Sequence, residues 1–400
     1  MTMTIRASEE TVVAEIYDLD TDELYIDELD DIDLPFAQPQ PVTYEDWKAF
    51  VDRPFPTKPE TPSKTDFSRM TEQEKSQSKK TRMTYHAAFG PLKTDSYLEI
   101  SSDLLLLASN NLRAGAGARV GGVIDGEGTL GKTTVMLQIG RKYEKARRKQ
   151  MCDRLGKDDL MPNNWVFIPV VYIVLPGETT PKSLYEALAK YYAVPLTKTN
   201  TLSWLKRQVT EYARNCGTSL IMVDDIHYLK MENRSDEDVN NHLKELANLI
   251  SATLVYAGID CDGSNLFNEG RSNDNKHFSQ TRRRFKRYRV KPYSIRSKVQ
   301  KERWVKLIRS FDDHLLLVGH EPNSLTNFAE YIFYRTGGSI GAVSTLIRQG
   351  ANLAIKEGEE EISKKLLDRI LLDEGSEDFY SRYLARKRRP SHKKKEKPEK

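Results

Sequence analysis

The chain has 400 residues, a formal net charge of +4 and three cysteines. This length can hold two or three domains with real cores. No apolar run approaches the roughly 20 residues that span a bilayer, and acidic residues interrupt the N-terminus where a signal peptide needs an apolar core. Cys152, Cys216 and Cys261 are scattered and odd in number, which argues against a disulfide framework or a zinc site. We therefore expect a cytoplasmic protein without membrane contact.

The two ends of the chain carry opposite charge. Residues 9–33 are crowded with Asp and Glu and lack Lys and Arg, whereas 386–389 and 393–395 form basic clusters. Such blocks are normally disordered and often contact partners. The acidic end is equally consistent with a purely solubilising role, while the basic end favours nucleic acid because Lys and Arg gain affinity by releasing counterions. We expect residues 1–65 to be an acidic, Pro-rich flexible arm, in which Tyr44–Phe50 fits a short docking helix.

Between the ends, the pattern of apolar residues changes twice. Residues 66–112 form an N-terminal helical segment, with a charged helix over 69–86 and a second one from near Asp95 that leads into the core. In residues 113–294 short apolar strands alternate with helices, which predicts an α/β core with a parallel sheet. The strands are expected at 118–124, 165–175, 219–223 and 253–259, and helices begin near 134, 181, 202 and 239.

After residue 294 the pattern is helical throughout. Trp304, Leu307, Ile308 and Phe311 fall on one helical face, and further helices are expected at 325–334 and 341–356. We therefore expect a small helical lid over residues 295–373, followed by a basic C-terminal tail over 374–400.

The most informative motif is a phosphate-binding loop at residues 126–133, which read Gly-Glu-Gly-Thr-Leu-Gly-Lys-Thr. A predicted strand precedes it and a helix follows, which is the context that G-x-x-x-x-G-K-[ST] requires and that a simple glycine-rich turn lacks. Backbone amides and the helix N-terminus face the anion. Lys132 would neutralise the β and γ oxygens, and Thr133 would hold Mg²⁺. The predicted ATP-binding set is Gly126, Glu127, Gly128, Thr129, Leu130, Gly131, Lys132, Thr133 and Thr134.

A pair of carboxylates ends the strand predicted at 219–223. In a phosphate-loop ATPase, one acid at this strand tip bonds the water on Mg²⁺, and the next polarises the water that attacks the γ-phosphate. We assign Asp224 to the metal and Asp225 to the catalytic base. An Asp-Asp pair alone is weak evidence because turns are rich in Asp, but the upstream phosphate loop strengthens the assignment.

A cluster of guanidinium groups lies at residues 282–287. Arginine has a permanent charge and a rigid fork, which suit it to the charge that develops on a transferred phosphoryl group. Our hypothesis is that Arg284 reaches the nucleotide of a neighbouring subunit as an arginine finger. The alternatives are a solvated basic loop and a DNA-contacting patch. His227, just after the acids, fits a packing role better than a catalytic one.

Taken together, these segments resemble the AAA+ transposition regulators of the TniB/TnsC type. The resemblance rests on five stretches within residues 80–372, and both ends of the chain lie outside it. They are Tyr85–Leu92, Asp125–Thr134, Val223–Leu229, Arg283–Phe285 and Thr336–Gly341.

The resemblance implies a P-loop AAA+ parallel-sheet core, a small helical lid and disordered tails. It implies an ATPase that assembles on double-stranded target DNA as a homo-oligomeric ring or filament. Such a protein recruits and activates a DDE-type transposase together with a target-selection protein. By position, Lys132 and Thr133 match the phosphate and magnesium residues, Asp224 the metal acid, Asp225 the catalytic acid and Arg284 the finger.

The chain departs from the usual superfamily pattern at three places. Asp225 stands where Glu is usual and is one methylene shorter, the fourth strand ends without the usual Asn or Thr, and Arg335 and Arg348 only flank the usual lid-sensor position. The shorter Asp225 predicts slow hydrolysis, and the other two departures argue against tight coupling between hydrolysis and lid motion. Three other readings remain open: a replication-initiator or helicase-loader relative, a nucleotide-gated scaffold with little turnover, and a signalling ATPase. The first lacks room for a winged helix after residue 372, and the last lacks internal repeats.

Overall fold

The computed structural model describes residues 40–115, 117–156, 166–228, 234–259, 261 and 284–388. The acidic block at 9–33, the basic cluster at 393–395, Asp260 and the arginines at 282–283 lie outside these residues. Within them, every helix is too short or too polar to span a bilayer. The strands are β1 (Gly121–Asp125), β2 (Val170–Val174), β3 (Leu220–Asp224), β4 (Thr253–Gly258) and β5 (Phe285–Arg289).

The five strands form one parallel sheet in the order β2-β3-β4-β1-β5. Four of them correspond to the strands predicted from the sequence. The fifth, β5, was missed, because it is an edge strand in which only Tyr288 is buried and three of the five residues are basic. The register pairs Phe285 with Gly121, so β5 begins at the amino end of β1.

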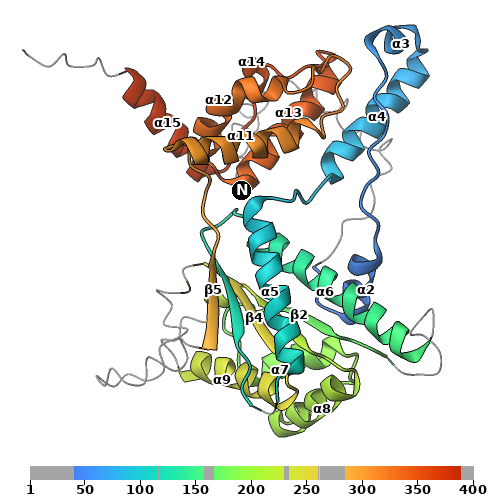
Figure 1. Ribbon diagram of the computed structural model, residues 1–400, viewed down its shortest axis with the longest axis vertical. Coiled ribbons are helices and arrows are strands. Elements are labelled where there is room, and N and C mark those ends of the chain that lie inside the picture. The colour runs from blue at the N-terminus through green and yellow to red at the C-terminus, as the bar shows by residue number, and fades with distance from the viewer. Residues whose placement is uncertain are drawn as a thin grey trace, which may run out of the picture.

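The helices divide between the two faces of the sheet and a separate helical layer above it (Figure 1). On one face lie α2 (Tyr44–Asp52), α5 (Asp95–Arg113) and α6 (Lys132–Leu155). The opposite face is covered by α7 (Pro181–Tyr191), α8 (Leu202–Asn215) and α9 (Arg234–Leu249). Thr180 caps α7 and Pro181 begins it, as the sequence predicted. A 3₁₀ turn, η1 (Ile226–Tyr228), follows β3.

The helical lid has its own apolar core, built around Trp304, Ile332 and Leu346. It comprises α11 (Lys298–Asp312), η2 (Ser324–Phe328), α12 (Ala329–Thr336), α13 (Ile340–Glu357) and α14 (Lys364–Leu367). An α/β core of the AAA+ kind with a helical lid is therefore confirmed.

Three segments differ from the predicted division of the chain. Helix α2 lies inside the predicted flexible arm, but Trp47 and Val51 bury it in the core. Helix α4 (Glu72–Ala88), preceded by α3 (Lys64–Arg69), packs on the lid through Tyr85 instead of leading into the core. Helix α15 (Glu374–Arg388) lies inside the predicted basic tail.

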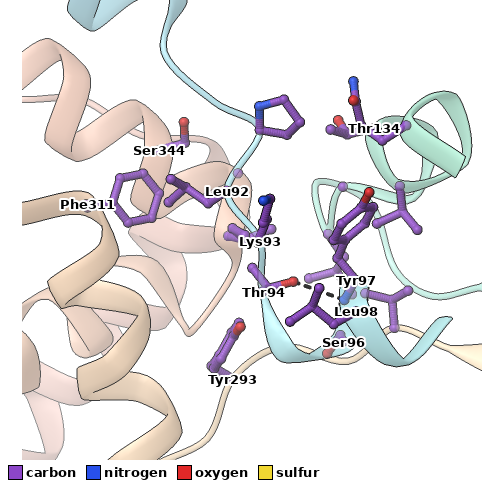
Figure 2. A pocket seen from close by; sticks show the side chains of 18 of the residues that line it. Leu92, Lys93, Thr94, Ser96, Tyr97, Leu98, Thr134, Tyr293, Phe311 and Ser344 are labelled. Atoms are coloured by element: carbon purple, nitrogen blue, oxygen red, sulfur yellow. Dashed lines mark hydrogen bonds between the residues drawn. The ribbon is translucent and has the colours of Figure 1, made fainter. Parts of the chain in front are cut away.

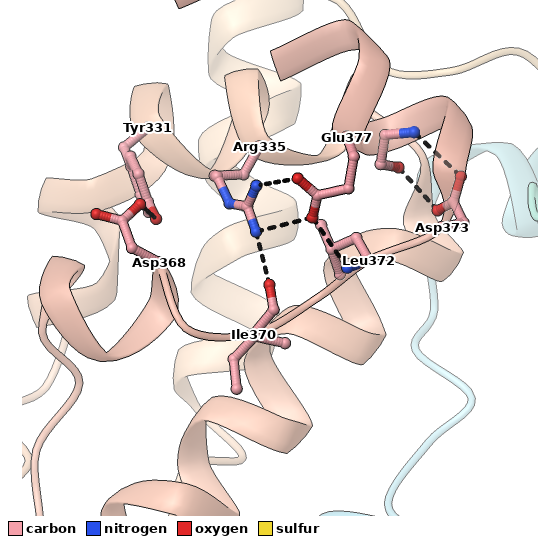
Figure 3. A network of polar contacts seen from close by, with 8 residues as sticks. Tyr331, Arg335, Asp368, Ile370, Leu372, Asp373 and Glu377 are labelled. Atoms are coloured by element: carbon pink, nitrogen blue, oxygen red, sulfur yellow. Dashed lines mark hydrogen bonds and ion pairs between the residues drawn. The ribbon is translucent and has the colours of Figure 1, made fainter. Parts of the chain in front are cut away.

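Helix α15 packs against α12 through a partly buried ion pair and an aromatic stack. Arg335 forms two hydrogen bonds to Glu377 at 2.9 and 3.1 Å, and a third, of 2.6 Å, to the carbonyl of Ile370 (Figure 3). The rings of Tyr334 and Tyr383 stack with their centroids 3.7 Å apart. Partners far apart in the chain anchor both α2 and α15, which a reading based on charge and proline content cannot detect.

Because of these placements, the chain crosses between core and lid three times. It leaves the core after α2, joins the lid at α3 and α4, returns to the core at α5, and enters the lid again after β5 (Figure 1). On the first crossing the Lys58 ammonium donates to the carbonyl of Asp313 at 2.5 Å. Three separate connecting segments of the chain therefore link the lid to the core that carries the phosphate loop.

Candidate nucleotide site

The phosphate loop lies at the carboxyl end of β1 and leads into the N-terminus of α6. Gly131 has φ +80°, a left-handed conformation that favours glycine, and a Cβ at Gly126 would lie 2.4 Å from the carbonyl oxygen of Val290. Lys132 donates to the carbonyl of Glu127 at 2.5 Å, inside the loop. Partial burial lowers the pKa of Lys132, and the charges of Asp224, Cys261 and nearby acids oppose that shift. The loop therefore lies between a strand and a helix, as the motif requires, and the phosphate-binding role of Lys132 stays a prediction.

Asp224 meets the phosphate loop from the end of β3. Its side chain is only 2% exposed, and burial raises the pKa of its carboxyl, while hydrogen bonds from the Thr133 hydroxyl and the Asp225 amide lower it. The Asp225 N–H lies 2.9 Å from Oδ1. A buried carboxylate beside a threonine hydroxyl is an oxygen pair that suits Mg²⁺, which binds few protein ligands and retains several waters. Thr133 and Asp224 therefore fit the metal role assigned from the sequence.

Asp225 differs in environment from its neighbour. Its backbone has φ +55°, a left-handed conformation that Asp tolerates better than most residues. The carboxylate is 38% exposed, and its Oδ1 lies 3.9 Å from Nδ1 of His227. The side chain is thus available to a water or phosphate group instead of being held by buried donors. That position is compatible with the base role, which stays a prediction.

Arg284 is exposed and directly precedes β5. Because β5 starts beside Gly121, Arg284 lies at the edge of the sheet opposite to the phosphate loop of its own chain. It therefore lies away from the phosphate loop of its own chain, and its role as a finger toward a neighbouring molecule stays a prediction.

Neither arginine that flanks the lid-sensor position is free. Arg335 is bound to Glu377, as described above. Arg348 donates to the carbonyls of Ala87 and Phe89, and its guanidinium lies 4.6 Å from the centre of the Phe89 ring. Both side chains hold the lid together.

The lid touches the phosphate loop at the start of α13. The carbonyl of Thr129 accepts from the Gly341 N–H at 3.0 Å and from the Ser339 hydroxyl at 3.2 Å, and the two hydroxyls lie 3.0 Å apart. A Cβ at Gly341 would lie 2.6 Å from the same carbonyl, so glycine is needed for this approach. The Thr336–Gly341 stretch quoted from the sequence is thus the place where lid and loop meet.

Beside this contact a cleft of about 650 Å³ opens between core and lid. Figure 2 shows side chains that line it: Leu92 and Tyr97 come from the segment that leads into α5, Thr134 comes from α6, and Tyr293 from the segment after β5. The cleft also includes Gly131 and Thr134 of the phosphate loop, so it is continuous with the phosphate site. Its size and largely apolar lining suit a nucleoside. The sequence reasoning missed these lining residues, because each is an ordinary apolar residue until the fold brings the segments together.

The parallel sheet, the phosphate loop and the helical lid together define the fold of a P-loop nucleotide hydrolase of the AAA+ class. Among solved structures, the chain is similar to the Aeropyrum pernix ORC2 protein in its ADPNP-ADP complexes, with a TM-score of 0.52, 12% identity, and coverage of 74% of this chain and 69% of that chain. It is also similar to the Aeropyrum pernix ORC1 protein in complex with DNA, with a TM-score of 0.50, 14% identity and coverage of 70% of this chain. The chain spans 65% of the length of that ORC1 chain, and identities this low establish the fold alone.

A match to a protein family is more specific than the likeness in fold. Residues 118–294 match the family model described as the bacterial TniB protein, which confirms the resemblance to the TniB type. No curated protein matches the sequence.

Proposed function

We propose that this chain is an ATP-dependent, DNA-binding regulator of DNA transposition. With ATP and Mg²⁺ it would oligomerise on double-stranded target DNA, and there recruit and activate a DDE-type transposase in company with a target-selection protein, in the cytoplasm. The match of residues 118–294 to the TniB model supports this biological role. Hydrolysis would dismantle the assembly.

The observation that carries nucleotide control is the contact between lid and phosphate loop. Ser339 and Gly341 bind the carbonyl of Thr129, three residues before Lys132. A nucleotide in the loop would therefore act directly on the position of α13 and so of the lid. A change in lid position alters the surface that one subunit offers to the next, which is how ATP would favour the oligomer.

A second candidate is a nucleotide-gated scaffold with little turnover. The exposed, short side chain of Asp225 favours it, as do the bonds that keep Arg335 and Arg348 inside the lid. The two candidates share nucleotide binding and assembly, and they differ only in hydrolysis.

The test is ATP turnover by the purified protein with and without long double-stranded DNA, with particle size followed in the same samples. DNA-stimulated turnover together with large ATP-dependent particles supports the regulator. ATP-dependent particles without turnover support the scaffold. If DNA changes neither quantity, both DNA-based proposals are wrong.

Two variants assign the roles in this assay. Lys132→Ala should abolish nucleotide binding and DNA assembly, because the phosphates lose their cation, while Lys149→Ala, an exposed lysine on the same helix, should change neither. Asp225→Asn keeps a residue that tolerates the left-handed backbone, and should lower turnover about 100-fold while assemblies persist longer. Normal assembly of Lys132→Ala on DNA would contradict nucleotide gating.

A further inference from the structure

The metal acid Asp224 is held by a tyrosine from the neighbouring strand. Tyr172 on β2 is completely buried, and its hydroxyl donates to Oδ2 of Asp224 at 3.0 Å. Tyr172 pairs with Met222 across the sheet, two residues before Asp224. Side chains two apart on a strand share a face, so the long tyrosine reaches its diagonal neighbour on the side of α6.

This bond complements the one that Asp225 makes. The backbone amide of Asp225 occupies Oδ1 of Asp224, and the Tyr172 hydroxyl occupies Oδ2. With one donor on each oxygen, the rotation of the carboxylate is fixed. Groups that orient a metal-binding carboxylate in this way commonly contribute 10–100-fold to metal affinity.

The ring of Tyr172 is in turn covered by Trp47 of α2. The two rings stack at an angle of 20° with their centroids 6.1 Å apart. Trp47 is completely buried, and its indole N–H donates to Glu144 on α6 at 3.3 Å. A Cβ at Gly140 would lie 2.7 Å from the Trp47 ring, so α6 approaches the indole as closely as glycine permits. The indole is therefore wedged between α6 and Tyr172.

Helix α2 is capped at its N-terminus and anchored to α6 at its C-terminus. The Thr43 hydroxyl accepts from the Asp46 N–H at 3.1 Å, and Arg141 of α6 donates to the carbonyls of Val51 and Arg53. The Arg141 guanidinium also lies 4.2 Å from the centre of the Phe55 ring. Arg141 therefore fixes the C-terminal end of α2 to α6.

From this geometry we propose that Tyr172 is a positioning residue for the magnesium acid, and that α2 sets the position of Tyr172 through Trp47. A helix outside the matched family segment thereby becomes part of the metal site. The inference rests on the proposed ATPase function. It adds that the site is complete only when α2 is docked.

The test measures how Mg²⁺ strengthens the binding of a fluorescent ATP analogue, compared with binding in EDTA. Tyr172→Phe removes only the hydroxyl and keeps the ring under Trp47. It should raise the half-saturating Mg²⁺ concentration about 10-fold and leave the affinity in EDTA unchanged. Excess Mg²⁺ should restore most of the turnover. Tyr256→Phe is the matched control: it is an equally buried strand tyrosine whose hydroxyl binds Asn240, and it should leave the Mg²⁺ response unchanged.

A tryptophan pair tests the contribution of α2. Trp47→Phe should also raise the half-saturating Mg²⁺ concentration, but only about 3-fold, because a phenylalanine ring keeps part of the contact with Tyr172. Trp304→Phe is the control for this variant. Trp304 is buried in the lid, and its indole N–H donates a hydrogen bond to the carbonyl of Ala329. That variant should lower the melting temperature without changing the Mg²⁺ response.

Three different results would contradict three different parts of the proposal. A wild-type response to Mg²⁺ in Tyr172→Phe would overturn the positioning role, and the same result in Trp47→Phe alone would overturn the part of α2. If the wild-type protein binds the analogue no better with Mg²⁺ than without, the proposed ATPase site itself fails.

Discussion

The interior of the lid and the contact between lid and core are built from different interactions. Inside the lid, Arg82 and Glu360 form a buried bidentate ion pair with distances of 2.6 and 2.8 Å, and the buried Arg335 forms a second bidentate pair with the partly exposed Glu377. Toward the core, Ser339 forms neutral hydrogen bonds with Thr129, and Lys306, whose side chain is 66% exposed, pairs with Asp95. Exposed pairs contribute about 0–1 kcal/mol, whereas breaking a buried one costs about 3–5 kcal/mol. The lid is thus a rigid unit on a weak attachment, and a nucleotide needs to supply little free energy to move it.

The largest effect is expected inside the lid. Arg82→Met leaves the buried Glu360 carboxylate without its cation, and should lower the free energy of unfolding by about 3–5 kcal/mol. Urea denaturation measures this. Arg69→Met removes an exposed arginine from α3 and should cost less than about 0.5 kcal/mol. Equal losses in the two variants would contradict the idea that α4 is an integral part of the lid.

The next effect depends on pH. His86 on α4 is fully buried, and burial, together with the charges of Arg82 and Arg348, lowers its pKa to about 4, while its Nε2 accepts from the Leu316 N–H. Between pH 6.5, the ordinary pKa of a histidine, and pH 4, His86 binds a proton in the unfolded chain but not in the folded one. Stability should therefore fall as the pH drops from about 6.5 to 4, by about 3 kcal/mol in total.

The control for this prediction is His86→Gln, whose amide oxygen can still accept the Leu316 N–H but does not titrate. Denaturation midpoints measured between pH 4 and 7 should vary less in this variant than in the wild type. An unchanged pH dependence would mean that other groups cause the acid sensitivity.

The smallest effect is expected at the attachment to the core. Ser339→Ala removes the hydroxyl contacts with Thr129, each worth about 0.5–1.5 kcal/mol, but leaves the Gly341 N–H in place. Global stability should barely change, while nucleotide release should become a few-fold faster in stopped-flow measurements. Ser310→Ala, which removes a hydroxyl bonded within α11, should leave release unchanged. Slower release in Ser339→Ala would show that the contact opposes nucleotide binding.

The sequence predicted those features that depend on neighbours in the chain. Helix α8 occupies residues 202–215 as expected, and the strand that ends in Asp224 follows from an unbroken apolar run. The phosphate loop was recognisable because its glycines and lysine are contiguous. Features that need distant partners were predicted less well. The short helix α2 was expected, but its partner Glu144, 97 residues after Trp47, was not, and α15, which depends on Arg335, 42 residues before Glu377, was missed. Tyr172 looked like one more apolar strand residue until the register placed it beside Asp224.

The position of α4 in the chain has a consequence for protein synthesis. Tyr85 and Phe89 leave the ribosome early, yet the lid helices that cover them, α11 to α13, begin only at Lys298. At roughly 5–20 residues per second, these aromatic rings wait on the order of 10–50 seconds for their partners. The α/β core, by contrast, has all its strands by Arg289. The core can therefore form before the second half of the lid is synthesised, and the rings of Tyr85 and Phe89 stay uncovered on the nascent chain during that interval.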